Sequence, residues 1–414
     1  MPSIKVYVSK LRTWGLKGVW NFFIGQIRDF RLKQYFSHNA HQYPLTPECG
    51  ITLIAPFGAK LSLSKVMRDL AFTLKDAGIP YQTFNLCCKS EIPGEDLKDI
   101  LTPRRDFRIQ KYSHVVEMFK SPLPDELNLS RSTIVFWEFE SGLLEFQPSL
   151  AQAHHVIAMS DFDLSVFKQL LPANVQTSKI LYPFRFTPGE LVPPVEIRRR
   201  YGLSADDFIV FFNFDYNSSF ARKNPDGAIR AFAKAFKGNP HTKLVFKTMH
   251  VREHANDAAK LRTLTNQLGI GAQFIAIDNY IPMRDLYSLT NACDVYLSLH
   301  RGEGLGLGIA EAMSLGKAVI VSDYSATTEF CNERNSIPVP CQKVAVRKEQ
   351  IDHPCYLSVK EWAEPDIDAA ASALLKLYND PELRNRLGNS AKAFIAEHFS
   401  PSNFKASVEK FLNE

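Results

Sequence analysis

Apolar and polar residues alternate along the chain in blocks that predict strands and helices in turn. Short runs rich in Val, Ile and Phe are typical of buried strands, and stretches with apolar residues every three or four positions are typical of amphipathic helices. In the first half, the pattern predicts strands at residues 50–57, 81–86, 114–119, 132–139 and 155–160, and helices at 62–78 and 161–171. It assigns no regular element to residues 87–113.

The alternation is more regular in the second half. Strands are predicted at 208–215, 243–248, 272–278, 294–299 and 318–322, and helices at 225–238, 253–268, 283–291, from about 305, and at 381–398. Prolines cluster between the halves, so residues 186–203 are predicted to form a linker. Alternating strands and helices indicate an open parallel sheet with helices on both faces. The predicted fold class is therefore α/β, with two Rossmann-like, doubly wound domains that face each other across a cleft.

Composition and charge narrow the class of protein. The chain has 414 residues, too many for one ordinary core, and its 45% hydrophobic and 22% charged residues are typical of a globular protein. A net charge of +5 permits an anionic small molecule or a membrane surface as partner without requiring nucleic acid. The seven cysteines show no C-x-x-C spacing, which favours a reducing cytoplasmic location over a disulfide framework or a zinc site.

The N-terminal segment, residues 1–36, mixes Trp and Phe with Lys and Arg. No apolar run is long enough to span a bilayer, and no signal-peptide pattern is present. Basic residues interleaved with aromatic ones are typical of a helix that lies in a membrane interface. A helix packed on its own domain explains the pattern equally well, so both interpretations stay open.

Basic residues are predicted at the carboxyl edge of the second sheet. Arg222 and Lys223 precede Asn224-Pro225, which is a favourable N-cap followed by a favourable first helical residue. A helix start attracts anions through its free amides and its dipole. Lys247 closes the next predicted strand and is expected at the same edge. Taken alone, the basic pair could equally be two solvated surface cations.

A glycine-rich turn follows the strand at 294–299. The stretch "HRGEGLGLGIAEAM" has glycines that let the backbone approach a ligand, and it places Glu303 in the turn and Glu311 on the following helix. Ile309 occupies the position where a dinucleotide fingerprint needs Gly or Ala, which disfavours a hydride-transfer enzyme. Each glutamate alone could be structural. The whole set at one sheet edge favours a phosphate and ribose site.

These residues carry a resemblance to a known family. "FARKNPDGAIRAFAKAF", "LVFKT", "DVYLSLHRGEGLGLGIAEAMSLGKAVIVSDYSATTEF" and "WAEPDIDAAA" resemble the donor domain of family 4 (group 1) retaining glycosyltransferases with the GT-B fold. The likeness covers most of residues 208–385, and its centre is an E-x7-E signature from Glu303 to Glu311. It implies an acceptor-side domain at 37–185, a donor-binding domain at 204–390, and a final helix at 391–414 that crosses back to the first domain.

The resemblance also implies roles for individual residues. Arg222, Lys223 and Glu303 would be catalytic, with the two cations on the donor diphosphate and Glu303 on the transferred sugar. The implied donor-binding residues are Lys247, Gly304, Leu305, Gly306, Glu311 and Tyr280. The implied acceptor-side residues are Gly58, Trp137 and Glu138. No cofactor and no metal are expected, because the two cations would stabilise the leaving diphosphate without one.

The expected function is transfer of a sugar, with retention, from a nucleotide-sugar donor such as a UDP- or GDP-sugar to a glycan or lipid-linked acceptor. Polysaccharide or glycolipid biosynthesis is the expected setting, in the cytoplasm or peripherally on the inner face of the membrane. Other interpretations stay open: a nucleotide-sugar epimerase or a sugar phosphorylase of the same fold, or a non-catalytic sugar-nucleotide binding module.

Overall fold

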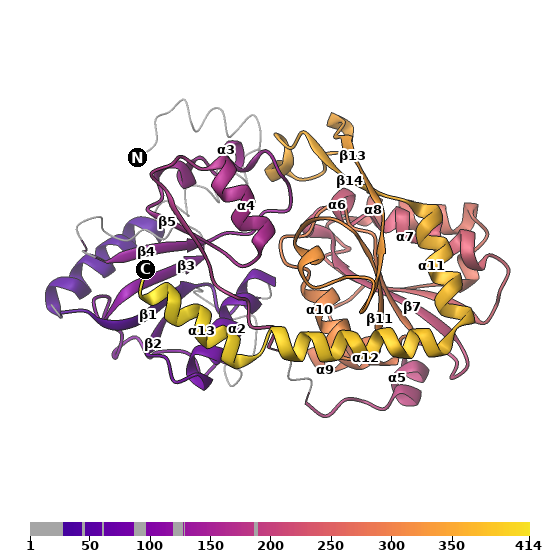
Figure 1. The fold of residues 1–414 in the computed structure, drawn as a ribbon, viewed down its shortest axis with the longest axis horizontal. Helices are drawn as coiled ribbons and strands as arrows, with labels where there is room; N and C mark the ends of the chain where they lie inside the picture. The colour runs from indigo at the N-terminus through magenta and orange to yellow at the C-terminus, as the bar shows by residue number, and fades with distance from the viewer. Residues whose placement is uncertain are drawn as a thin grey trace. The chain divides into compact units, whose positions relative to one another are not determined.

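A computed structural model describes residues 28–43, 46–59, 62–86, 97–118, 127, 129–185 and 189–414 (Figure 1). Most of the predicted N-terminal membrane segment, up to residue 27, lies outside these residues. A helix covers residues 28–42. On this helix Phe36 is fully buried against Phe84 and Phe107, whereas Phe30 is 63% exposed. The described end of the segment therefore packs partly on its own unit.

The chain divides into two compact units. The first comprises the chain up to Val135, Ala153–Ile157 and Glu409–Glu414, and the second comprises Phe136–Gln152 and Ala158–Val408. The predicted linker at 186–203 contains a helix, α5 (Pro194–Arg200), whose Ile197 is buried in the core of the second unit. Proline clustering marked this segment as irregular, but Pro194 is the first residue of the helix, a position that tolerates proline.

Within the described residues, the first sheet has six strands in the order β2-β1-β3-β4-β5-β6. Its elements are β1 (Glu48–Ala55), α2 (Ser62–Asp76), β2 (Tyr81–Asn85), β3 (Tyr112–Met118), β4 (Ser130–Ile134), α3 (Leu143–Phe146), β5 (His155–Ala158), α4 (Asp161–Leu170) and β6 (Gln176–Lys179). The predicted strand at 132–139 is too long. It ends at Ile134, and shortly afterwards the Trp137 amide donates to the Asp163 carboxylate (3.3 Å) instead of a strand.

The second sheet has six strands in the described chain, in the order β12-β11-β10-β7-β8-β9. They are β7 (Phe208–Asp215), β8 (Thr242–Met249), β9 (Phe274–Ile277), β10 (Val295–Ser298), β11 (Ala318–Ser322) and β12 (Ile337–Val339). The helices are α6 (Phe220–Lys223), α7 (Pro225–Phe236), α8 (Ala255–Gln267), α9 (Met283–Ala292), α10 (Leu307–Ser314), α11 (Ile367–Asn379), α12 (Pro381–His398) and α13 (Pro401–Leu412). An antiparallel pair, β13 (Cys341–Ala345) and β14 (Glu361–Pro365), was not predicted.

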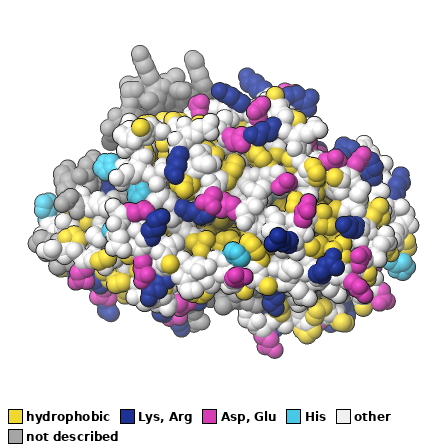
Figure 2. Space-filling view, in the orientation of Figure 1, with side chains coloured by type: hydrophobic (Ala, Val, Ile, Leu, Met, Phe, Trp, Pro, Cys, Tyr) yellow, Lys and Arg dark blue, Asp and Glu magenta, His cyan; other side chains and the backbone are white. Residues whose placement is uncertain are grey.

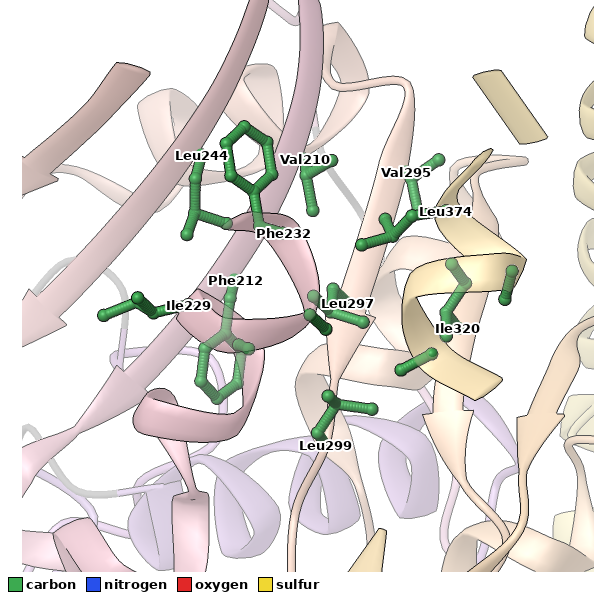
Figure 3. Close-up of a cluster of buried hydrophobic side chains, with 14 of the residues drawn as sticks. Val210, Phe212, Ile229, Phe232, Leu244, Val295, Leu297, Leu299, Ile320 and Leu374 are labelled. Atoms are coloured by element: carbon green, nitrogen blue, oxygen red, sulfur yellow. The ribbon is translucent and has the colours of Figure 1, made fainter. Parts of the chain in front are cut away.

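The central strand β7 is buried on both faces, as a parallel sheet covered by helices requires. Val210 and Phe212 contribute to a core with α7 and α11, which lie side by side (Figures 1 and 3). Ile209 and Phe211 contribute to a second core with α9, α10 and α12. Alternate residues of β7 thus pack against helices on opposite faces of the sheet. The prediction of an α/β fold with two parallel, doubly wound sheets is confirmed.

The surface agrees with the modest net charge. On the face drawn in Figure 2, basic and acidic side chains are interspersed and do not form one large field of either sign. Among the described helices, none combines the length and the apolar character needed to cross a lipid bilayer.

Candidate functional site

The site lies in the second unit, where three strands end together. β7 pairs in parallel with both β8 and β10, so their carboxyl ends lie at one edge of the sheet. The chain continues from these ends into α6, into the turn at residues 250–254 and into the glycine-rich turn. In open α/β sheets this edge is where ligands bind.

The basic pair directly precedes the start of α7, as predicted. Arg222 and Lys223 also form the last turn of the short helix α6, which was not predicted. The predicted cap at Asn224 is confirmed: its side-chain oxygen accepts the Gly227 amide (3.1 Å), and its side-chain nitrogen donates to the Leu299 carbonyl (2.9 Å). Asn224 therefore starts α7 and ties the basic pair to the end of β10.

The guanidinium of Arg222 is almost fully enclosed by protein oxygens. Arg222 is 4% exposed; its Nε donates to the Ser218 carbonyl (3.1 Å) and its Nη1 to the Gly302 carbonyl (2.8 Å). The same group lies 3.4 Å from Glu303 Oε2 and 3.7 Å from Glu138 Oε1. Arg222 thus fastens the glycine-rich turn to α6.

Glu303 is the acidic centre of this network. One of its carboxylate oxygens is paired with the Lys223 ammonium and the other with Arg222. Burial opposes ionisation of the carboxyl, but the adjacent Lys223 and Arg222 charges outweigh it and lower the pKa of Glu303 to about 2. For Arg222, burial opposes the charge, and neighbouring oxygen groups outweigh it and raise the pKa further. Both groups are therefore ionised at neutral pH.

The glycines of the turn are required first by the protein's own packing. A Cβ added at Gly302 would lie 2.6 Å from the Glu138 carbonyl oxygen, so the two backbones could not approach as they do. Gly306 has φ 77° and caps α10 in the left-handed conformation. The prediction that these glycines admit a ligand gives only part of their role, because they also admit the segment that begins at Phe136.

Lys247 lies at the carboxyl end of β8, as predicted. It is 4% exposed, and it pairs in register with Asn213 of β7. Burial, opposed by Asp215, lowers the pKa of Lys247 to about 8. The buried ammonium is therefore still mostly charged at pH 7.

The two remaining donor-side side chains lie on α10 and on a loop. Glu311 is on α10, and one of its carboxylate oxygens accepts a hydrogen bond from Tyr287 Oη (3.3 Å). Tyr280 lies in the loop between β9 and α9 and is 51% exposed. Gly304 and Leu305 precede the Gly306 cap, and Leu305 is 8% exposed. Glu303 thus lies in the turn after β10 and Glu311 on α10, as the E-x7-E signature predicted.

The residues predicted for the acceptor side belong to different units of the chain. Gly58 lies in the first unit, in a turn that Arg68 holds by donating to the carbonyls of Phe57 and Ala59 (2.7 and 3.0 Å). Trp137 is 2% exposed and donates its indole N–H to the Ser141 carbonyl (2.9 Å), so its contacts are those of a core residue.

Glu138 belongs to the Arg222 network. One of its oxygens lies near the Arg222 guanidinium, and the other accepts a hydrogen bond from Tyr356 Oη (3.3 Å). The structure thus brings Glu138 together with Arg222, Lys223 and Glu303. A position on the acceptor side stays a prediction.

Two supporting residues were missed. Asp352 accepts hydrogen bonds from the Ser219 hydroxyl (2.5 Å) and the Ala221 amide (2.7 Å), and so holds the start of α6. His300 is fully buried below the turn, and burial lowers its pKa to about 4. Asp352 is more than 120 positions from its partners, and no local pattern in the sequence marks such a contact.

The comparisons with known proteins agree with this geometry. Residues 196–352 match the family described as glycosyl transferases group 1. This part of the chain is similar to group 1 glycosyl transferases. This region includes Arg222, Lys223, Lys247 and the E-x7-E pair, and the predicted resemblance is confirmed. EpsD of Bacillus subtilis, which is named as a glycosyltransferase, is 25% identical over 209 residues, which are 50% of this chain and 46% of EpsD. The match thus spans about half the length of that curated relative.

Solved structures show the same fold over most of the chain. Sucrose-phosphate synthase from Thermosynechococcus elongatus superimposes with a TM-score of 0.61 at 17% identity, over 88% of this chain and 98% of that one. Anabaena HepE in complex with UDP-glucose gives 0.62 at 14% identity, over 88% and 100%. A glycosyltransferase from Rickettsia africae gives 0.63 at 14% identity, over 88% and 98%. The predicted GT-B fold is confirmed.

Proposed function

We propose that this chain is a retaining glycosyltransferase that moves a sugar from a nucleotide-sugar donor to a hydroxyl of a glycan or lipid-linked acceptor. The observation that carries the proposal is the buried cluster of Arg222, Lys223 and Glu303 at the carboxyl edge of the second sheet. It combines two cations with a carboxylate that burial would otherwise neutralise. Such a cluster offers a diphosphate and a polyhydroxyl group their preferred partners side by side.

Each side chain has a distinct part in the proposal. Lys223 binds the diphosphate and stabilises the negative charge that develops as the bond to the sugar breaks. Arg222, whose donors meet carbonyl and carboxylate oxygens, adds positive charge and holds the glycine-rich turn. Glu303 accepts hydrogen bonds from the transferred sugar, and Glu311 accepts them from the ribose. Tyr280 borders the base.

The enzyme then acts mainly by positioning and electrostatics. Retention through a carboxylate nucleophile would need a pair of carboxyl groups about 5 Å apart, one of them free to attack. Glu303 is instead held by two cations. Attack by the acceptor on the same face as the departing diphosphate, with the leaving phosphate taking the acceptor proton, needs no such nucleophile and follows the family resemblance.

The first test is a thermal shift panel of UDP-, GDP- and ADP-sugars. HepE is described with UDP and with UDP-glucose, so UDP-sugars head the panel. A donor present at 100 times its dissociation constant should stabilise the protein by about 2.7 kcal/mol. Stabilisation by none of the three classes would contradict the proposal.

Product analysis then separates the reaction classes. A glycosyltransferase releases nucleoside diphosphate and forms a new glycoside with a retained anomeric configuration. An epimerase would isomerise the donor without an acceptor, a phosphorylase would require inorganic phosphate, and a binding module would turn nothing over. EDTA should change the rate by less than about a factor of two if no metal ion takes part.

The acceptor and the location stay predictions that the N-terminal segment can test. A polyprenyl-linked acceptor would place the enzyme at the inner face of the membrane. If residues 10–36 bind there, the protein should float with anionic liposomes at low salt and detach as salt rises. A protein that stays off such liposomes at low salt would show that the segment packs on its own domain.

A further inference from the structure

A left-handed backbone at residues other than glycine occurs, within the described chain, at Ser219, Asn224, His250 and Ser325. These residues lie in the segments that follow β7, β8 and β11, and β11 pairs in parallel with β10. A left-handed backbone strains a residue that has a Cβ, and such strain persists where the surrounding fold enforces it, commonly at functional sites. The strained positions of the described chain therefore lie at the sheet edge that carries the charged cluster.

Ser325 contacts the backbone of Glu303. It is 3% exposed, has φ 66° and begins the short helix η5 (Ser325–Glu329) after β11. Its hydroxyl accepts the Glu303 amide (2.9 Å), and the next amide, that of Ala326, donates to the Glu303 carbonyl (3.2 Å). The left-handed turn at Ser325 thus holds both polar groups of the Glu303 backbone.

A second hydrogen bond fixes the direction of the Ser325 hydroxyl. Ser325 Oγ donates to the Tyr324 carbonyl (2.6 Å), which leaves its lone pairs to accept the Glu303 amide. The Tyr324 oxygen also lies 3.4 Å from Nε2 of the buried His300. Ser325 therefore belongs to a chain of polar contacts that ends at Glu303.

Glu303 is held from two directions. Its carboxylate is paired with Lys223 and Arg222, and its backbone is bonded to Ser325 and Ala326. A glycine in place of Ser325 would adopt the same φ without strain, but it would have no hydroxyl to accept the Glu303 amide. A fold shaped for stability alone would favour glycine at this position. The strain is therefore explained by the contact that the hydroxyl makes.

We propose that Ser325 is a positioning residue for the transfer reaction, which acts through Glu303 by holding its backbone with a strained turn. This inference rests on the proposed function, in which Glu303 binds the transferred sugar. The rate of a positioned reaction falls steeply when a group in the site moves by about 1 Å, so the support behind Glu303 contributes to kcat. The bare nucleoside diphosphate lacks the sugar, so its affinity should not depend on Ser325.

The test compares Ser325→Gly with Ser325→Ala, which both remove the hydroxyl and differ in backbone strain. Both variants should lower kcat about tenfold, the loss expected for one buried hydrogen bond. Calorimetry should show that the affinity for the bare nucleoside diphosphate stays within about twofold of the wild type. Ser325→Gly should melt about 2–4 °C above Ser325→Ala, because glycine adopts the left-handed backbone without strain.

A double-mutant cycle shows whether Ser325 acts through Glu303. In the Glu303→Ala background, Ser325→Gly should change kcat by less than about twofold, because the carboxylate that it positions is absent. A merely structural role would lower kcat by the same factor in both backgrounds.

Ser336 is the matched control. It is 1% exposed, its hydroxyl donates to the Asn332 carbonyl (2.9 Å), and its φ is not positive. Ser336→Gly and Ser336→Ala should both keep the wild-type kcat. The order of stability should be the reverse of that at Ser325, with the glycine variant melting lower, because glycine gains no relief from strain there.

Four results would contradict the inference. Wild-type kcat in both Ser325 variants would overturn it and leave the proposed function standing. An equal loss of diphosphate affinity, or a tenfold loss of kcat that persists in the Glu303→Ala background, would show that Ser325 supports the fold of the edge and not Glu303. Melting of Ser325→Gly below Ser325→Ala would show that the turn is not strained. A wild type that transfers sugar from none of the UDP-, GDP- and ADP-sugars would overturn the proposed function, and this inference with it.

Discussion

The interior of the second unit and the carboxyl edge of its sheet are almost equally buried. The interior contains apolar side chains, whereas the edge contains charged ones. In the interior, Phe212 and Phe232 are at most 1% exposed and belong to a cluster of apolar side chains (Figure 3). At the edge, Arg222 and Lys247 are each 4% exposed and carry charges. Apolar burial stabilises a fold, whereas charge burial commonly does not. The difference indicates that the edge is shaped for a ligand.

The largest effect on stability is expected in the interior. Phe232→Ala removes a fully buried ring between α7 and the sheet, so the second unit should lose about 3–5 kcal/mol of unfolding free energy. Denaturant unfolding, followed through the transition of the second unit, measures the loss. Leu375→Ala is the control, because Leu375 lies on α11 and is 40% exposed.

The same variant tests the separation of the two regions. Below its melting temperature, Phe232→Ala should bind nucleoside diphosphate with an affinity within about twofold of the wild type, because the ring belongs to the apolar core and effects at independent sites add. A folded variant that no longer binds nucleotide would contradict that separation.

The largest effect on catalysis is expected at the edge. Lys223→Ala and Arg222→Ala should each lower turnover by at least about a hundredfold, because a buried cation near the leaving group is lost. Steady-state rates with the donor found in the thermal shift panel measure the effect. Lys234→Ala, an exposed lysine of α7 paired with Asp368, should leave the rate unchanged.

Only one of these variants should also damage the fold. Arg222→Ala leaves the carboxylates of Glu138 and Glu303 without their shared cation and two carbonyls without a donor, so its melting temperature should fall clearly below that of Lys223→Ala. Wild-type turnover in both variants would show that the edge is not the diphosphate site.

Substitutions of Glu311 and Glu303 should have different effects on binding and turnover. Glu311→Ala should weaken binding of both donor and nucleoside diphosphate by about 1.5–3 kcal/mol, since both contain the ribose. Glu303→Ala should lower kcat while leaving the affinity for the bare diphosphate nearly intact, as the loss of a sugar contact does. Calorimetry and steady-state rates on both variants distinguish the two roles. Equal weakening of the bare diphosphate would show that this division is wrong.

The smallest effect is a pH dependence of stability. The pKa of Lys247 is lowered by burial from 10.5 to about 8, so between these values the unfolded chain binds more protons than the folded one. This group therefore makes the unfolding free energy rise with pH across that window. Lys247→Met lacks this group, so its stability relative to the wild type, measured by denaturant unfolding at several pH values, should be highest below pH 8 and should fall as the pH rises toward 10.5. A relative stability that does not change between pH 7 and 10 would show that the pKa of Lys247 is the same in the folded and the unfolded chain.

The same comparison shows which features the sequence reveals. Five strands of the second sheet, β7 to β11, were predicted with ends correct to within two residues, because burial on both faces leaves a continuous apolar run. The three-residue strand β12 was missed, because it is too short to form such a run. The polar strand β6, with the sequence Gln-Thr-Ser-Lys, was missed because nothing in it resembles a buried strand. The hairpin of β13 and β14 was missed for the same reason.

At the site, the residue types were predictable and their partners were not. Arg222, Lys223, Lys247, Glu303 and Glu311 were identified from turn and helix-cap patterns and from the family resemblance. The pairing of Arg222 with Glu138 joins positions 84 residues apart. Such contacts depend on tertiary packing, which local patterns do not encode.

The central claim is that the buried charges at the carboxyl edge of the second sheet form a nucleoside diphosphate site. The most direct measurement is a crystal structure of the full chain with the nucleoside diphosphate that stabilises it most. The account predicts phosphate oxygens about 3 Å from the Nζ atoms of Lys223 and Lys247, the distance of a charge-assisted hydrogen bond. A diphosphate bound away from both lysines would contradict the account.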